Sequence, residues 1–211
     1  TSHRSVLRLM RYVTPDGAIS EEGIAALVDA VSQARVVAER EKVDEFLATA
    51  TSAVREATNG TEVIARIEAA LGQPLQVLGG VSEARLTFLA VRRWFGWSAI
   101  QILLFDIGGG SLEIAAGSDE LPDEAASVPL GAGRMTIAYL PDDPPGEEAV
   151  DRLRTHARQT LQPLTKTFGA LPRPDHTVGS SKAIRSLAKL VGYPMPGWSG
   201  SERMMLPRAA L

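Results

Sequence analysis

Residues 100–117 have the sequence IQILLFDIGGGSLEIAAG, and this stretch decides the fold of the chain. An apolar run of strand length leads to Asp106 and three glycines, and a second run of strand composition follows Ser111. The pattern predicts a β-hairpin closed by residues 108–110. Glycine has no Cβ, so backbone N–H groups in such a turn can converge on an anion, and Ser111 adds a hydroxyl donor.

Asp106 is a candidate metal ligand beside the same turn. It stands at the end of the predicted buried strand, where its carboxylate would hold a divalent cation directly or through water. The alternative is structural, since three glycines can form a tight turn without binding anything. The Asp before the glycines and the Ser after them favour the anion-binding interpretation.

Composition limits the kinds of site that the chain can build. Its 211 residues, 45% hydrophobic and 22% charged, suffice for one sizeable core or two small ones. The absence of Cys excludes disulfides and thiolate metal sites. The three His are scattered along the sequence, which argues against an imidazole cluster.

Charge and hydropathy bear on the partners. The formal net charge of -3 is too small to indicate a nucleic-acid partner, so a bound anion would rely on local Arg and Lys. The longest apolar run is far shorter than the ~20 residues of a membrane span, and the sequence starts without a signal-peptide profile. We therefore expect a cytoplasmic protein with neither nucleic acid nor membrane as a partner.

The first half of the chain alternates strand-like and helix-like segments. Residues 6–10 predict a strand already under way, and Ser20 is expected to cap a helix. Further strand and helix patterns follow in turn at residues 45–50, 51–57, 61–70 and 74–78. This alternation predicts a sheet with crossover helices.

Glu83 is a candidate functional carboxylate. A helix is predicted from a cap at Ser82 to about Trp94, and Glu83 lies in its first turn, where the helix dipole favours a negative charge. On these grounds Glu83 is either a charge that complements the dipole or a functional group, and both interpretations stay open.

The second half repeats the order of strand, small-residue turn and helix. Residues 126–130 predict a strand that leads through Gly131 into a helix, and residues 147–164 predict a long amphipathic helix. Residues 176–178 predict a short strand that ends in the small residues 179–181 before another helix. Small residues at a helix N-terminus expose backbone N–H groups, so this turn is a second candidate anion site.

The order of elements indicates a fold. A hairpin precedes alternating helices and strands, and glycine-rich strand ends bracket the second half. This order predicts an α/β protein of the actin-like ATPase (ribonuclease H-like) fold, in which two similar domains hold phosphates between paired glycine hairpins. The expected domains are residues 1–98 and residues 99–211.

The sequence also resembles the exopolyphosphatase and guanosine pentaphosphate phosphohydrolase (Ppx/GppA) family, and its actinobacterial branch most closely. The matching stretches are residues 50–59 (ATSAVREATN), 79–86 (GGVSEARL), 106–113 (DIGGGSLE), 179–182 (GSSK) and 185–188 (RSLA). Together they span most of the chain in family order, which makes the resemblance more specific than any single glycine cluster.

The resemblance implies a role for each stretch. It makes Glu83 the catalytic residue that activates water, and Arg55 a phosphate-binding residue. It implies that phosphate oxygens are bound by Gly108, Gly109, Gly110 and Ser111, and that Asp106 binds Mg²⁺. It also implies that a phosphate channel lies near Gly179, Ser180 and Ser181. Beside the resemblance, Arg134, Lys182 and Arg185 are candidates for further contacts with a polyanion.

The implied activity is a Mg²⁺-dependent release of terminal phosphate from inorganic polyphosphate, with guanosine pentaphosphate as the rival substrate and a homodimer as the assembly. The family's first phosphate hairpin, Asp-x-Gly-Ser-Asn, has no counterpart here, and the second domain normally continues past Leu211. Both domains are therefore expected to be incomplete. Two alternatives stay open: a non-catalytic phosphate or alarmone sensor, which the missing hairpin favours, and an actin-like kinase or ATPase.

Overall fold

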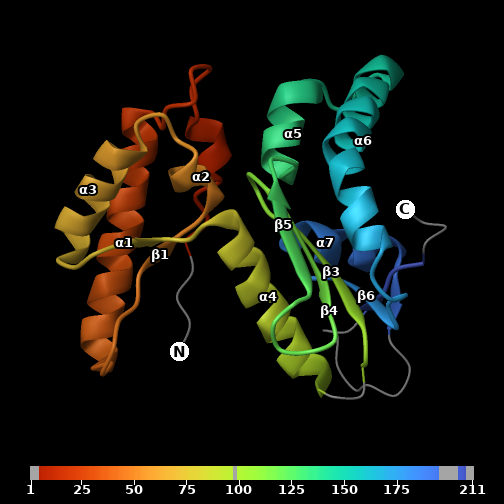
Figure 1. The fold of residues 1–211 in the computed structure, drawn as a ribbon. Coiled ribbons are helices and arrows are strands. Elements are labelled where there is room, and N and C mark those ends of the chain that lie inside the picture. Colours follow the sequence, from red (N-terminus) through yellow and green to blue (C-terminus); the bar gives the residue numbers. More distant parts are fainter. Residues whose placement is uncertain (1–4, 97–98, 195–203, 208–211) are drawn as a thin grey trace. The chain divides into compact units, whose positions relative to one another are not determined.

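The computed structural model describes residues 5–96, 99–194 and 204–207. The chain divides into two compact units, Thr1–Gly80 and Val81–Leu211, shown in Figure 1. The predicted domain boundary after residue 98 adjoins positions outside the described residues, and the structural division falls earlier, at Gly80.

The first unit combines helices with a small parallel sheet. Its elements are a 3-10 helix (Leu9–Tyr12), α1 (Glu21–Glu41), β1 (Thr49–Ala50), α2 (Ser52–Arg55), α3 (Gly60–Leu71) and β2 (Gln76–Val77). β1 and β2 pair in parallel, so the predicted alternation is confirmed, although each strand has only two residues. Its core is formed by buried residues of α1, α2 and α3, among them Ile24, Val54 and Val63.

Two predictions at the start of the chain have different outcomes. Ser20 caps α1 as expected, because its Oγ accepts a hydrogen bond from the Gly23 N–H at 3.3 Å. The strand predicted at residues 6–10 is wrong. Arg8 has a φ of 50°, which is incompatible with an extended strand, and a 3-10 helix follows at Leu9–Tyr12.

The second unit contains a four-stranded sheet. Its elements are α4 (Gly80–Phe95), β3 (Ile102–Ile107), β4 (Leu112–Gly117), β5 (Glu124–Val128), α5 (Ala132–Tyr139), α6 (Glu147–Gly169), β6 (His176–Gly179), α7 (Lys182–Val191), β7 (Tyr193–Pro194) and β8 (Met204–Met205). The strand order is β5-β4-β3-β6, antiparallel except that β6 runs parallel to β3. No helix among the described residues is long and apolar enough to span a membrane.

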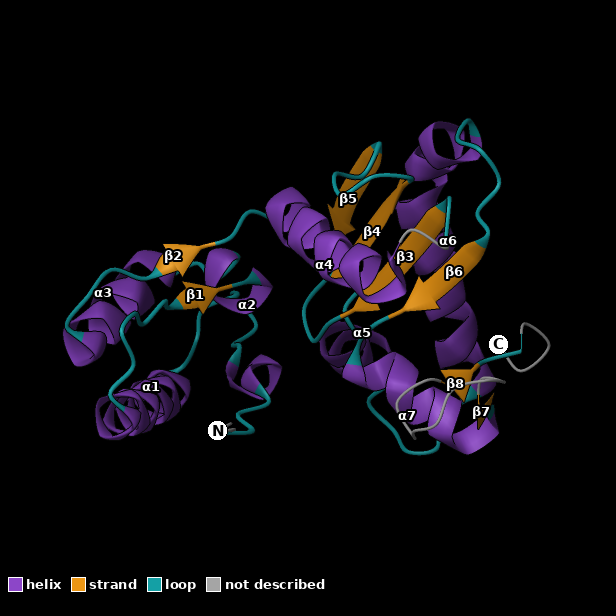
Figure 2. Cartoon of the chain, turned by 90° about the horizontal axis from the view of Figure 1, so that it is seen from below, coloured by secondary structure: helices purple, strands orange, loops and turns teal. Residues whose placement is uncertain are grey.

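Helices cover both faces of this sheet (Figure 2). On one face, Phe88 and Val91 of α4 pack with Leu104 and its neighbours on the strands. On the other face, α5 and α6 pack against residues such as Leu112 and Ile114 of β4. Successive side chains of the hairpin strands therefore point into two different hydrophobic cores, as expected of a sheet that is buried on both faces.

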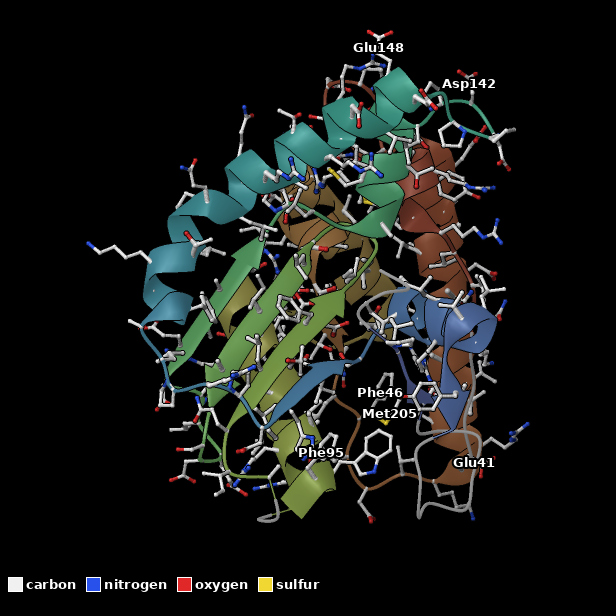
Figure 3. The ribbon with its side chains drawn as sticks, turned by 90° about the vertical axis from the view of Figure 1, so that its right-hand side faces the viewer. Glu41, Phe46, Phe95, Asp142, Glu148 and Met205 are labelled. Carbon is white, nitrogen blue, oxygen red and sulfur yellow. The ribbon has the colours of Figure 1, made fainter. Side chains whose placement is uncertain are left out.

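α4 packs against the sheet and runs antiparallel to β3. At its C-terminal end, Phe95 (labelled in Figure 3) stacks on His176 at the start of β6, with ring centroids 5.2 Å apart. The helix begins at Gly80, so the predicted cap at Ser82 is wrong: Ser82 lies inside the first turn. The helix therefore starts two residues earlier than expected, at a glycine, a residue of poor helix propensity.

Candidate functional site

The predicted hairpin is confirmed. β3 and β4 pair with Ile107 opposite Leu112, and the Gly108 N–H donates to the Ser111 carbonyl at 2.9 Å, which closes a turn of residues 108–111. We call these residues the glycine turn. None of its glycines has a positive φ, so the backbone conformation alone does not require glycine. What the missing side chains provide is access to the backbone.

Three backbone donors of the glycine turn have no hydrogen-bond partner within the described structure. They are the N–H groups of Gly109, which is exposed, and of Gly110 and Ser111, which are buried. Buried backbone donors are almost always paired with protein, water or a ligand. The N–H groups of Gly110 and Ser111 therefore match the predicted anion site in kind and in place, and that of Gly109 lies next to them.

Asp106 belongs to a row of polar side chains that crosses the sheet. It lies opposite Glu113 on β4, and Glu113 lies opposite Ser127 on β5. Ser180 continues the row just past β6, where its N–H donates to the Phe105 carbonyl at 3.1 Å. Alternation along the strands puts the row on the face that α4 covers. We call Asp106, Glu113, Ser127 and Ser180 the polar row.

The polar row contains a pair of carboxylates. Residues directly opposite each other in an antiparallel pair have Cβ atoms ~4.5–5.5 Å apart, so Asp106 and Glu113 are neighbours. Glu113 is 1% exposed, and its Oε1 accepts a hydrogen bond of 2.7 Å from the Ser127 hydroxyl. This bond fixes the buried Glu113 carboxylate to Ser127 of the neighbouring strand β5.

Burial raises the pKa of Asp106, and the Ser180 hydroxyl counters part of the rise. The Ser180 Oγ is itself buried and makes no hydrogen bond of standard geometry within the described structure. The end of the row thus holds a partly desolvated carboxyl beside an unsatisfied hydroxyl. Both groups are suited to a ligand or ion that completes their interactions.

Glu83 lies at the same end of the sheet. From Phe95 back to Glu83 the helix rises ~18 Å. From Ile102 to Asp106 the strand rises ~13 Å in the same direction, so Glu83 is about one helical turn beyond the level of Asp106. Glu83 is half-buried in the first turn of α4. These rises put the first turn of α4 toward the end of the sheet that carries the glycine turn, and a catalytic role for Glu83 stays a prediction.

The second predicted turn is also present. β6 ends at Gly179, α7 begins at Lys182, and the Ser181 Oγ caps α7 by accepting from the Ile184 N–H at 3.2 Å. Gly179 has a packing cause, because a Cβ there would lie 2.4 Å from Cγ2 of Ile184. Ser180 is the residue of this turn that joins the polar row. A phosphate-binding role for residues 179–181 stays a prediction.

Arg55 is the last residue of α2, in the first unit. Its Nη1 donates to the Leu78 carbonyl at 2.7 Å, and its Nη2 lies 3.3 Å from Glu56 Oε1. The guanidinium therefore ties α2 to the segment after β2. Because Arg55 and the glycine turn belong to different units, a shared phosphate site stays a prediction.

Sequence reasoning did not single out Glu113 or Ser127. A signal for Glu113 was present: a four-residue turn that begins at Gly108 places position 113 opposite Asp106 by simple counting around the hairpin. Ser127 required the register between β4 and β5, which the sequence does not specify because a longer connection joins those strands.

Fold and site together define an α/β protein whose glycine hairpin ends beside a carboxylate pair. The chain belongs to the Ppx/GppA phosphatase family, whose sequence profile matches residues 1–194. Exopolyphosphatase 1 of Mycobacterium leprae is 46% identical over 192 residues, which are 91% of this chain and 57% of that protein. The resemblance to this family and to its actinobacterial members is confirmed.

Solved structures agree with the family. An exopolyphosphatase from Cytophaga hutchinsonii matches with a TM-score of 0.76 at 29% identity, over 82% of this chain and 55% of that one. The Ppx/GppA family member of Aquifex aeolicus matches with a TM-score of 0.67 at 27% identity, over 88% and 58%. The predicted α/β, actin-like fold class is confirmed. The chain spans little more than half the length of these relatives.

Proposed function

We propose that this chain carries the phosphate and metal site of a Mg²⁺-dependent exopolyphosphatase, which releases terminal phosphate from inorganic polyphosphate. The observation that carries the proposal is that three N–H groups without a partner, those of Gly109, Gly110 and Ser111, follow directly on the carboxylate pair that Asp106 of β3 and Glu113 of β4 form. Membership of the Ppx/GppA phosphatase family and relatives named exopolyphosphatase support it.

Each group has a proposed task in the hydrolysis. Water adds to the terminal phosphorus while the bridging P–O bond to the rest of the chain breaks, and Glu83 orients the water and accepts its proton. The N–H groups of the glycine turn, with the Ser111 hydroxyl, bind oxygens of the phosphoryl group and stabilise their charge. Residues 179–181 are proposed to bind the next phosphates along the chain.

The residues present fit Mg²⁺. This ion commonly takes one or two protein carboxylates and keeps several waters, and Asp106 with Glu113 provides such a pair. No group of three or more potential ligands from His, Cys, Asp and Glu occurs in the described part of the chain. When bound, Mg²⁺ would neutralise charge on the phosphate oxygens.

The direct test is phosphate release from long-chain polyphosphate with Mg²⁺, using the protein expressed from its complete coding sequence. We expect release, and parallel reactions with guanosine pentaphosphate measure the preference between the two substrates. Polyphosphate binding without release would favour the sensor alternative. Phosphate transfer between ATP and an acceptor, without attack on polyphosphate, would favour the kinase alternative.

Location and assembly belong to the same proposal. We propose a cytoplasmic protein, for which the absence of Cys is weak support, and a homodimer. Cell fractionation measures the first and sedimentation velocity the second. A monomer over the accessible concentration range would contradict the dimer and leave the proposed chemistry standing.

Asp106→Asn should raise the Mg²⁺ concentration needed for half-maximal hydrolysis, because the neutral amide is a weaker ligand for this ion. The same variant should unfold at a higher temperature without metal at neutral pH. Burial raises the pKa of Asp106, so the folded state holds this proton more tightly than the unfolded state. The carboxyl then destabilises the fold increasingly as pH rises from about 3.9, its unfolded pKa, toward the raised value.

Melting temperatures from pH 4 to neutral pH measure this effect, and Asp142→Asn is the control. Asp142 is an exposed residue of the α5–α6 connection, labelled in Figure 3. The stabilisation by Asp106→Asn should shrink toward pH 4, while the control should change little at any pH. A Mg²⁺ requirement equal to that of the wild type would refute the metal assignment.

Arg55→Ala should weaken polyphosphate binding by roughly the 1.5–3 kcal/mol of a hydrogen bond to a charged group. Because the substitution also removes the bond to the Leu78 carbonyl, unfolding is measured beside a salt-controlled binding titration. Arg66→Ala in α3 is the control for loss of a positive charge, since Arg66 pairs with Glu21. Equal affinities for wild type and Arg55→Ala would remove Arg55 from the phosphate site.

A further inference from the structure

The carbonyl groups of the three glycines in the glycine turn are held by the start of α5. The Ala132 N–H donates to the Gly108 carbonyl at 2.9 Å, and the Arg134 N–H donates to the Gly109 carbonyl at 2.9 Å. The Arg134 side chain adds a third bond, from Nε to the Gly110 carbonyl at 2.8 Å. α5 has no side-chain cap, so these bonds also pair donors of its first turn that a helix leaves free.

Holding these carbonyls aims the unpaired donors. In a trans peptide unit the C=O of one residue and the N–H of the next point in opposite directions. Bonds from α5 to the carbonyls of Gly108 and Gly109 therefore direct the N–H groups of Gly109 and Gly110 away from α5. Both donors lack a partner within the described structure, as does the Ser111 N–H, which shares a peptide unit with the Gly110 carbonyl.

The contact depends on Gly131, the residue before α5. A Cβ there would lie 2.3 Å from the Gly110 carbonyl carbon, 2.4 Å from the Ser111 nitrogen and 2.5 Å from the Gly109 carbonyl carbon. All three are backbone atoms, so a side chain would push the turn away from the helix. Gly131 has a φ of -72°, which any residue adopts. Space and not backbone conformation therefore requires glycine at this position.

We propose that the start of α5 fixes the glycine turn in its anion-binding conformation, with Gly131 and Arg134 as positioning residues. The inference rests on the proposed function, since it concerns how the same turn binds phosphate. Arg134, which sequence analysis considered as a contact to the polyanion, acts here on the turn through the Gly110 carbonyl. The ligand class is inorganic phosphate or the terminal phosphate of a chain.

Gly131→Ala is the first test, because it removes no charge and no hydrogen-bond donor. Its matched control is Gly146→Ala, since Gly146 precedes α6 with similar backbone angles and a Cβ there meets nothing within 4 Å. With tripolyphosphate as the probe, we expect Gly131→Ala to lose about ten- to a hundredfold in affinity, as expected for the loss of one or more hydrogen bonds to a charged ligand. The control should bind as the wild type does.

Amide resonances of Gly109 and Gly110 provide a readout that does not depend on activity. In the wild type they should shift on titration with tripolyphosphate, and in Gly131→Ala they should be displaced before any ligand is added. Arg134→Ala is the second variant if Gly131→Ala fails to fold. It should displace the Ser111 amide, because the lost bond holds the Gly110 carbonyl and the Ser111 N–H belongs to the same peptide unit.

The results distinguish the positioning role of α5 from the anion site itself. Wild-type affinity and unchanged amides of Gly109, Gly110 and Ser111 in both variants would overturn the positioning role alone. A wild type whose Gly109 and Gly110 amides do not respond to tripolyphosphate would overturn the anion site of the proposed function, and the positioning role with it.

Discussion

Glu83→Gln should reduce phosphate release from polyphosphate by about 10²–10⁴-fold, the usual size of a general-base contribution, while polyphosphate binding is kept. The amide matches the carboxylate in size but cannot accept a proton from water. α4 packs on the sheet through Phe88 and Val91, and the proposed base Glu83 lies in its first turn. Turnover at saturating Mg²⁺, measured beside a binding titration, tests the expectation.

The control is Glu62→Gln, which removes a carboxylate from the first turn of α3. Both substitutions remove a charge that favours the helix dipole, worth about 0.3–1 kcal/mol of stability, so that effect is matched between them. Only Glu83→Gln should lose turnover. If both variants release phosphate at the wild-type rate, Glu83 merely complements the dipole and is not the base.

The elements that sequence predicted well are those set by local chemistry. The hairpin at residues 102–117 follows from two apolar runs of strand length with three glycines between them. The start of α1 follows from Ser20 and the acidic turn behind it. Each of these signals lies within a few residues of the structure that it determines.

The misses involve contacts between distant segments. Residues 6–10 have strand composition, but the backbone turns at Arg8 and continues as a 3-10 helix. Ser82 has the chemistry of a cap, but the helix starts earlier, at Gly80. Local propensity is a weak guide wherever tertiary packing decides the boundary.

The candidate site divides in the same way. The family motif located Asp106, the glycine turn and Ser180, and the structure brings all of them to one end of the sheet. Sequence could not show that α5 holds the carbonyls of the turn, because that contact joins residues 108–110 to residues 132–134 across an intervening strand. The two positioning residues are visible only in the folded chain.

Phe88→Ala should destabilise the second unit by about 3–5 kcal/mol, because it empties the largest fully buried side chain between α4 and the sheet. Leu86→Ala on the same helix is the control, since Leu86 is 52% exposed and should cost about 0.5 kcal/mol or less. Tryptophan fluorescence in urea reports on this unit alone, because all three Trp of the chain, at positions 94, 97 and 198, lie within Val81–Leu211.

The same substitution tests how Glu83 is positioned. If packing of Phe88 holds the helix against the sheet, Phe88→Ala should also lower turnover under conditions in which the protein is still folded, because the first turn of α4 is no longer fixed beside Asp106. Leu86→Ala should leave turnover unchanged. Equal stabilities for the two variants would show that α4 is not part of the core of the sheet, and the placement of Glu83 beside the carboxylate pair would then be wrong.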